Sequence, residues 1–368
     1  MKKICFVAQF PPPMHGLSKA VETLYNSNLN ADIDPHGEFE FEKVDITNNK
    51  NIIRNLIKIS RSKADLFYFT ISQTKGGNLR DLVIFKLLEL QHKKCLIHLH
   101  GGYFRQLVDN DMAGWQRKAN YSAISKLEGG IVLSNSLRSI FEGMMPEEKI
   151  HVVMNCVDTV FFPDEKKLIE KAERCEDVLH VLYLSNFIRA KGYPVVLEMA
   201  KMEKERIDAG VSQRYHFDFA GEFFEEEERE FFEHYIEENK LQSVVTYHGV
   251  VSGEKKIALL DMCRVFALPT RYPNEGQPIS ILEAMSNGMY ILTTDHAGIP
   301  DIVTDRVNGT ITDEENTSAA KYLNRLDELS FEKIRHVGLN NVKSCKEKFT
   351  EQQYIDGMRR IYEEVLSR

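Results

Sequence analysis

The sequence RVFALPTRYPNEGQPISILEAMSN occupies residues 264–287, and the rest of the chain repeats its organisation. Its first five residues are mostly apolar and predict a buried strand over 264–268. Turn-forming residues follow, and Pro278 suits the first position of a helix, where its missing N–H costs nothing. The stretch therefore predicts a strand, a loop and a helix over 278–287, which is a building block of parallel α/β sheets.

Two glutamates in this stretch are placed to contact a ligand at the start of the helix. Glu275 stands just before the helix. Glu283 lies about one and a half turns inside it, and helical side chains lean back toward the N-terminus. Free N–H groups and the helix dipole favour a phosphate at the same place. A phosphate flanked by two carboxylates that can bind hydroxyl groups suits a nucleotide sugar, whereas an ordinary helix start with two surface glutamates is the alternative.

Apolar runs alternate with helical periods along the whole chain, which predicts doubly wound parallel sheets. The predicted strands are 3–9, 39–45, 65–70, 94–99, 129–133, 150–154, 179–185, 215–221, 244–250, 264–268 and 289–294. The predicted helices are 17–28, 50–62, 79–92, 115–127, 135–144, 192–206, 225–239, 254–262, 278–287 and 314–327.

The length of 368 residues predicts two domains, because a single hydrophobic core seldom grows so large. We expect one domain over 1–165 and another over 178–345, with the boundary in the charged stretch 163–177. Residues 349–368 form an amphipathic pattern and predict a final helix.

Composition excludes several classes of protein. The formal charge of −8 argues against general binding of nucleic acid. No apolar run is long enough to span a membrane, and the first apolar run is too short for a signal peptide. The six cysteines form no C-x-x-C pair, which indicates free thiols in a reducing compartment. We therefore expect a cytoplasmic protein, with a peripheral position at the inner face of the membrane as the alternative.

Seven residues separate Glu275 from Glu283, and the segment between them resembles the E-x7-E signature of the retaining glycosyltransferases of family four. The continuation of that signature is similar to Gly288, Asp295, the stretch Ala297-Gly298-Ile299-Pro300 and the pair Asn308-Gly309. The resemblance implies the GT-B fold, an α/β fold in which two Rossmann-like doubly wound parallel-sheet domains face each other across a cleft. It also implies that the first domain binds the acceptor, that the second binds the nucleotide sugar, and that the last helix packs back on the first domain.

The same resemblance implies roles for individual side chains. Glu275 would hold hydroxyls of the donor sugar and stabilise positive charge at its anomeric carbon, while Glu283 would hold the ribose. His100, which follows a predicted strand and precedes two glycines, resembles the histidine of the family near the donor sugar. Lys191 matches the lysine of the family that neutralises the departing diphosphate.

Further donor-binding positions are expected in loops that follow strands. They are Gly16, Asn186, Arg189, Val250, Gln277, Pro278 and Ile279. The sequence departs from the pattern of the family at two of these loops: His15 stands where a second glycine is usual, and Asn186 stands where an arginine is usual. Arg189 lies nearby in sequence and is a candidate to supply the missing charge.

Asp109-Asn110-Asp111 matches the D-x-D motif that binds metal in the other glycosyltransferase fold, GT-A. We interpret it as a chance match, because it lies in a polar stretch well past the end of a strand. The sequence therefore predicts no metal and no cofactor, with the nucleotide sugar acting as a substrate.

The stretch 50–63 combines isoleucines and leucine with basic residues at helical spacing. Its apolar side is expected to pack on the first sheet. The alternative is a contact with a membrane surface, which would suit a lipid-linked acceptor.

The resemblance, together with these observations, implies a metal-independent retaining hexosyltransferase that moves a sugar from a nucleotide-diphosphate sugar, with UDP favoured. The acceptor would be a saccharide or a lipid-linked saccharide in the synthesis of a surface polysaccharide or glycolipid. A catalytically silent GT-B partner subunit is the alternative. A nicotinamide-dependent oxidoreductase is disfavoured, because no G-x-G-x-x-G follows a predicted strand.

Overall fold

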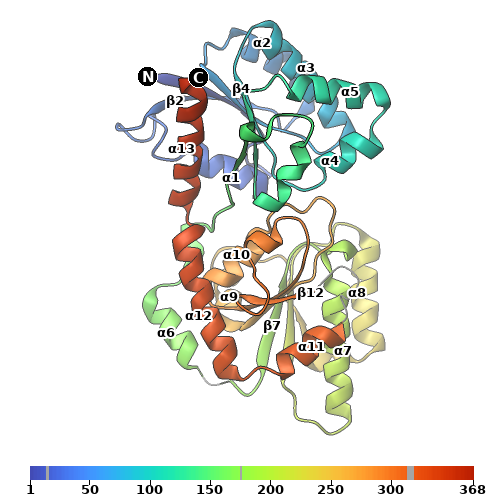
Figure 1. Ribbon diagram of the computed structural model, residues 1–368. Helices are drawn as coiled ribbons and strands as arrows, with labels where there is room; N and C mark the ends of the chain where they lie inside the picture. Colours follow the sequence, from blue (N-terminus) through green and yellow to red (C-terminus); the bar gives the residue numbers. More distant parts are fainter. Residues whose placement is uncertain (14–15, 175, 313–318) are drawn as a thin grey trace. The chain divides into compact units, whose positions relative to one another are not determined.

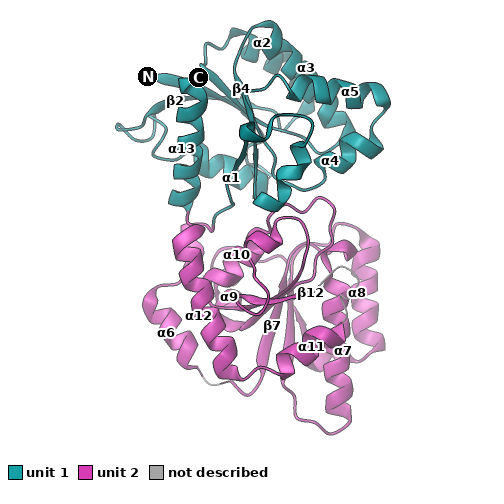
Figure 2. Cartoon of the chain, in the orientation of Figure 1, with its two compact units in different colours: residues 1–156, 351–368 teal, residues 157–350 magenta. Residues whose placement is uncertain are grey.

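Apolar runs of the sequence become the strands of two parallel sheets in the computed structural model, which describes residues 1–13, 16–174, 176–312 and 319–368. The described chain divides into unit 1, residues 1–156 and 351–368, and unit 2, residues 157–350 (Figure 2). Each unit has one sheet of six described strands, with helices packed against it (Figure 1).

The sheet of unit 1 has the strand order β2-β1-β3-β4-β5-β6, and neighbouring strands pair in parallel. Its strands are β1 (Lys2–Ala8), β2 (Phe39–Asp45), β3 (Leu66–Thr70), β4 (Cys95–His98), β5 (Gly129–Val132) and β6 (Ile150–Val152). Every residue of β3, β4 and β5 is buried, because helices cover both faces of a doubly wound sheet. This burial explains why these strands read as continuous apolar runs.

The α-helices of unit 1 are α1 (Gly16–Tyr25), α2 (Ile52–Arg61), α3 (Lys75–Leu90), α4 (Phe104–Gln106), α5 (Gly114–Ile124) and α13 (Glu351–Ser367). Helices α1 and α13 share one apolar core with the sheet, and Tyr354, Met358, Tyr362 and Val365 carry α13 into it. The aromatic rings of Tyr362 and Tyr68 meet edge to face with centroids 6.2 Å apart. The last helix therefore belongs to the core of unit 1.

The sheet of unit 2 has the order β12-β11-β10-β7-β8-β9, also parallel throughout. Its strands are β7 (Leu179–Leu184), β8 (Tyr215–Ala220), β9 (Val245–Tyr247), β10 (Val265–Leu268), β11 (Tyr290–Thr294) and β12 (Gly309–Thr312). Its α-helices are α6 (Glu165–Glu173), α7 (Tyr193–Asp208), α8 (Glu226–Glu238), α9 (Gly253–Met262), α10 (Ile279–Ser286), α11 (Ala319–Asp327) and α12 (Phe331–Lys348).

The structure corrects several predicted elements. Unit 2 begins at Val157, so the stretch 163–177 is not a boundary; it contains α6, whose Leu168 and Lys171 are buried. Residues 135–141 form a 3₁₀ helix instead of the predicted α-helix. Strand β12 and helix α12 were not predicted. Part of the predicted helix 314–327 lies outside the described residues, and α11 covers the remainder.

Candidate functional site

The loop between β10 and α10 is fixed in place by the loop that follows β11. The hydroxyl of Thr293 donates to the carbonyl of Leu268 at 2.9 Å. Beyond it, His296 Nε2 lies 2.8 Å from the carbonyl oxygen of Tyr272, and the amide of Gly298 donates to the carbonyl of Gly276 at 2.8 Å. These contacts hold the residues around Glu275 at the carboxyl end of the parallel sheet, where ligands of such folds bind.

The turn before α7 approaches the same loop closely. Gly192 has a φ of +86°, and a Cβ at this position would lie 2.3 Å from the carbonyl oxygen of Pro269. Only glycine combines this backbone conformation with so close an approach. The amide of Arg271 donates to the carbonyl of Ala190 at 2.6 Å and fastens the two segments together. Glycine at position 192 thereby allows the preceding lysine to reach the loop.

Lys191 and Glu275 form an ion pair at this junction. The Lys191 ammonium lies 3.4 Å from Glu275 Oε2 and 5.1 Å from the ring centroid of Tyr272. The hydroxyl of Thr270 donates to the same Oε2 at 3.1 Å. Glu275 is largely buried, whereas its other oxygen, Oε1, accepts no hydrogen bond from any described residue. One oxygen of the carboxylate is thus anchored, and the other is available to a ligand.

Glu283 is held in a similar way by a lysine that sequence patterns did not identify. The Lys256 ammonium, on α9, lies 2.7 Å from Glu283 Oε1 and 4.3 Å from the ring centroid of Phe161. Burial raises the pKa of Glu283, and the positive charge of Lys256 opposes that rise. Within the described chain, Oε2 of Glu283 accepts no hydrogen bond. Each glutamate therefore offers one oxygen to a ligand while a lysine holds the other.

Helix α10 begins between these two ion pairs. Pro278 is its N-cap, so the helix starts at Ile279, one residue later than predicted. The first α-helical amides point out of the helix without partners inside it, as at any helix start. Gln277 and Pro278 are buried, and Ile279 is half-buried. Backbone N–H groups and the positive end of the helix dipole are therefore presented beside Glu275, an arrangement that favours an anion.

Three other predicted donor-binding residues of unit 2 lie in loops after β7 and β9. Asn186 is exposed, and its backbone carbonyl accepts a hydrogen bond from Tyr183 at 2.9 Å. Val250 is 69% exposed. The Arg189 guanidinium lies 3.3 Å from Glu228 and stacks on Phe231 of α8. Arg189 is therefore directed toward α8. Of these two basic residues, Lys191 is the one that contacts Glu275.

Gly16 and His100 belong to unit 1. Gly16 is the first residue of α1 and is exposed, while His15 lies outside the described residues. His100 follows β4, and its ring packs against that of His98 with centroids 3.9 Å apart. His98 is fully buried and shares a hydrogen bond of 2.8 Å with the hydroxyl of Tyr68. Burial lowers the pKa of His98, and the nearby His100 lowers it further. Its complete burial and its hydrogen bond to Tyr68 indicate a structural role.

The two aspartates of the D-x-D match are engaged by neighbouring side chains. Arg117 Nε lies 3.3 Å from Asp109, and Arg105 forms a second ion pair with it. Asp111 accepts a hydrogen bond from the hydroxyl of Tyr103. These contacts give both carboxylates a structural role in the short π-helix (Leu107–Asp111) that follows α4.

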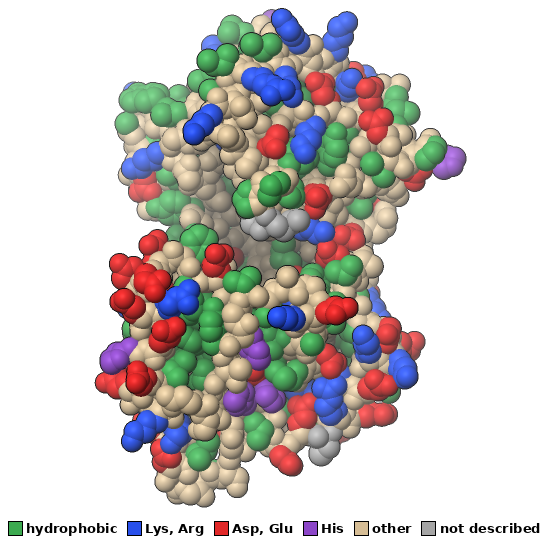
Figure 3. Space-filling model, turned by 180° about the vertical axis from the view of Figure 1, so that it is seen from behind, with side chains coloured by type: hydrophobic (Ala, Val, Ile, Leu, Met, Phe, Trp, Pro, Cys, Tyr) green, Lys and Arg blue, Asp and Glu red, His purple; other side chains and the backbone are tan. Residues whose placement is uncertain are grey.

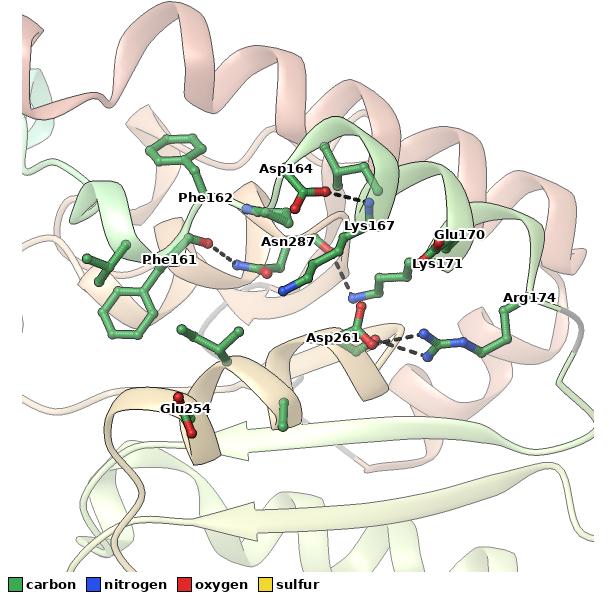
Figure 4. A pocket seen from close by; sticks show the side chains of 15 residues that line it. Phe161, Phe162, Asp164, Lys167, Glu170, Lys171, Arg174, Glu254, Asp261 and Asn287 are labelled. Atoms are coloured by element: carbon green, nitrogen blue, oxygen red, sulfur yellow. Dashed lines mark hydrogen bonds and ion pairs between the residues drawn. The ribbon is translucent and has the colours of Figure 1, made fainter.

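A pocket of about 690 Å³ lies between α6 and α9, next to Phe161 (Figure 4). Its charged side chains are largely paired. The Lys171 ammonium points inward from α6 and donates to the carbonyl oxygens of Leu260 and Asn287 at 2.7 and 2.8 Å. Arg174 pairs with Asp261 at 2.9 Å (Figure 4). The side chains that line this pocket therefore connect α6 to the ends of α9 and α10, the two helices that carry Lys256 and Glu283.

Comparison with known proteins places the site within a recognised domain. Residues 164–341 match the family model described as glycosyl transferases group 1. An uncharacterised 41.2 kDa protein of the cps region of Klebsiella pneumoniae is 22% identical over 307 residues, which cover 79% of this chain and 76% of that protein. WcaL of Escherichia coli K12, provisionally named a colanic acid biosynthesis glycosyltransferase, is 30% identical over 209 residues. That alignment covers 55% of this chain and less than half of WcaL.

The fold matches solved structures over its whole length. Anabaena HepE, crystallised in complex with UDP, superposes with a TM-score of 0.75 and 13% identity, covering 99% of this chain and 100% of HepE. HepE in complex with UDP-glucose gives a TM-score of 0.72 at 15% identity. The predicted α/β class with two Rossmann-like, doubly wound units of GT-B type is thereby confirmed. Among the described residues, no helix has both the length and the apolar character required to cross a membrane.

Proposed function

We propose that this chain, whose residues 164–341 match the family model of group 1 glycosyl transferases, is a retaining glycosyltransferase of family four. It would move a hexose-type sugar from UDP to a saccharide or a lipid-linked saccharide. The observation that carries the proposal is the pair of lysine-anchored glutamates on either side of the start of α10. Each leaves one carboxylate oxygen to bind the hydroxyls of a ligand.

The chemistry follows from the charges around that helix start. The diphosphate would lie against the N–H groups of α10, with the ammonium of Lys191 beside it. Preorganised donors of this kind stabilise negative charge as it develops on a leaving group. Glu275 would hold donor-sugar hydroxyls and stabilise the positive charge that grows at the anomeric carbon, and Glu283 would bind the ribose. The acceptor hydroxyl would attack the anomeric carbon from the side of the leaving group as the bond to UDP breaks, and a phosphate oxygen of the departing UDP would take its proton. The anomeric configuration would thereby be retained.

The donor and the product are inferred from relatives. HepE has been crystallised with UDP and with UDP-glucose, which supports UDP as the nucleotide. WcaL is named for colanic acid biosynthesis, which supports a role in making a surface polysaccharide. A lipid-linked acceptor would bring the chain to the cytoplasmic face of a membrane, and the basic stretch 50–63 would then be the point of contact.

One observation favours a catalytically silent partner subunit as the second candidate. The usual arginine is Asn186 here, and Arg189 is engaged by Glu228, so Lys191 supplies the cation beside Glu275 without that second charge. Slow hydrolysis of UDP-glucose by the purified chain would separate the two candidates, because a silent subunit would release no UDP above background.

The direct experiment replaces the two glutamates separately. Glu275→Gln should lower turnover about a hundredfold or more, because one charged group that stabilises the transition state is lost. Glu283→Gln should instead raise the KM for the donor. Glu254→Gln, an exposed glutamate on α9, is the matched control and should change neither value. Unchanged kinetics in both site variants would end the proposal, and an inverted product, identified by NMR of the anomeric proton, would end its retaining part.

A further inference from the structure

Two helices of unit 1 carry an apolar surface that the core does not use. On α2, Ile53 is 74% exposed and Ile57 is 47% exposed; on α3, Val83 is 52% and Leu90 is 67% exposed. Together with Leu56 and Leu87, these residues line a groove of about 650 Å³ between the two helices. Exposed apolar residues are ordinary when scattered singly, but a contiguous group of them indicates an interaction surface.

Specific contacts fix the rotation of α2 that exposes this surface. Asn55 and Ile59 face inward, and the side-chain amide of Asn55 donates to the carbonyl of Asp45 at 2.8 Å. Lys93 donates to the carbonyl of Ile59 at 2.7 Å and to two further carbonyls at the end of α2. The expectation that the isoleucines of 50–63 pack on the sheet therefore holds for Ile59 but is wrong for Ile53 and Ile57.

The basic residues on α2 and at its two ends are not paired with carboxylates. Residues 50–63 contain five basic residues and no acidic one, in a chain of net charge −8. No carboxylate of the described chain pairs with any of these five, which are Lys50, Arg54, Lys58, Arg61 and Lys63.

The acidic residues of α3 are already paired, Asp81 with Arg80 at 2.8 Å and Glu89 with Lys86 and Lys126. Figure 3 shows hydrophobic and basic side chains interspersed at the end of unit 1 that carries α2 in Figure 1.

We propose that the α2–α3 surface, defined by Ile53, Ile57, Val83, Leu90 and the basic residues of 50–63, binds an anionic lipid bilayer. An exposed apolar stripe inserts at the boundary between headgroups and acyl chains, while surrounding lysines and arginines contact anionic headgroups. The apolar groove and the uncompensated positive charge meet on α2, which is the combination that such a surface requires. A protein partner would need acidic residues to complement it, and a second copy of this chain would bring equal positive charges together.

The test measures co-sedimentation of the full chain with vesicles in the absence of any sugar nucleotide. Binding is expected to vesicles that contain phosphatidylglycerol and to be much weaker for pure phosphatidylcholine. It should also fall as salt is raised, because the Debye length shrinks from about 10 Å at 0.1 M salt. Since no donor is present, the result does not depend on the proposed glycosyl transfer.

Matched variants separate the two contributions. Ile53→Ser with Val83→Ser should weaken vesicle binding about tenfold or more, through lost apolar burial. The control is Ile169→Ser with Val211→Ser, which removes equivalent side chains from unit 2 that are 50% and 52% exposed. Arg54→Gln and Lys58→Gln should each weaken binding about fivefold, whereas Lys343→Gln on α12 should have no effect.

Three outcomes would overturn the proposal. They are no binding to either kind of vesicle, equal binding to anionic and neutral vesicles, and equal losses in the surface variants and their controls. If sedimentation of the free chain showed an oligomer that Ile53→Ser with Val83→Ser dissociates, without vesicle binding, the occupant would be a second copy instead. Circular dichroism of every variant confirms that a loss of binding does not arise from unfolding.

Discussion

Lys256 opposes the effect of burial on the pKa of Glu283, the more deeply buried glutamate of the site. Its ammonium contacts one oxygen of Glu283 and the ring of Phe161, so three segments of unit 2 meet at one ion pair. Sequence patterns identified Glu283 through its spacing from Glu275. They could not identify Lys256, because its partner lies on a different helix and no spacing rule links the two. Contacts between distant segments are the part of a site that a single sequence conceals.

Replacing Lys256 by Met should make donor binding sensitive to pH. Burial already raises the pKa of Glu283, and the lysine opposes that rise, so its removal moves the pKa further upward. A protonated Glu283 loses a charge-assisted hydrogen bond to the donor, worth about 1.5–3 kcal/mol. The KM for the donor should therefore rise about tenfold or more as pH falls, from a higher pH than in the wild type.

The pH profile of the donor KM is the measurement for this prediction. Lys255→Met, an exposed lysine beside it on α9, is the control, and Lys256→Arg should restore the wild-type profile. If the donor KM rose at the same pH in Lys256→Met and in the wild type, the ion pair would not control the pKa of Glu283.

At the scale of elements, the strands were the most predictable part of the fold. Strands such as β3 and β10 are buried on both faces, so they read as apolar runs bounded by turn residues. Strand β12 was not predicted, because its sequence, Gly309–Thr312, contains only one strongly apolar residue. The sequence also could not predict which side of α2 faces the core. A hydrogen bond from the Asn55 side chain to a backbone carbonyl decides it.

Helix α6 shows how a charged segment can still be structural. Lys171 is buried, and its ammonium donates to carbonyls at the ends of α9 and α10. Lys171→Met should lower the free energy of unfolding at pH 10 by about 1–3 kcal/mol, because two buried carbonyls lose their donor. Lys166→Met is the control on the same helix, with a side chain that is 85% exposed.

The pH dependence of this loss has a definite sign. Burial lowers the pKa of Lys171 to about 7 from its ordinary value of 10.5. Between these values the unfolded chain binds more protons than the folded chain, so the contribution of Lys171 to stability rises with pH across that window. Chemical denaturation from pH 7 to 10 should show the wild type gaining stability relative to Lys171→Met. Parallel pH profiles of the two proteins would contradict the depressed pKa.

At the scale of the whole molecule, the alternation of strands and helices was enough to predict two doubly wound units. That alternation is strong because each buried strand needs helices on both sides of its sheet. The position of the division was predicted less well, since α6 is as polar as a linker yet is anchored by Leu168 and Lys171. The resemblance implied that the last helix packs on the first domain. The buried side chains of α13 in the core of unit 1 explain this return of the chain physically.

The absence of a metal requirement is a prediction about the whole reaction. Asp109 and Asp111 are engaged by Arg105, Arg117 and Tyr103, so a metal ion would have to displace these contacts to bind the D-x-D match. Glycosyl transfer should therefore proceed at an unchanged rate after dialysis against EDTA. A loss of activity that Mn²⁺ or Mg²⁺ restores would show that a metal takes part.

The central claim is that the start of α10 binds a diphosphate while Glu275 and Glu283 bind the sugars on either side of it. A crystal structure of the chain with UDP-glucose tests this most directly. We predict the diphosphate against the N–H groups of Ile279 and its neighbours, with Glu283 on the ribose and Glu275 on the glucose. A nucleotide bound elsewhere, or bound there with both carboxylates beyond hydrogen-bonding distance, would contradict the claim.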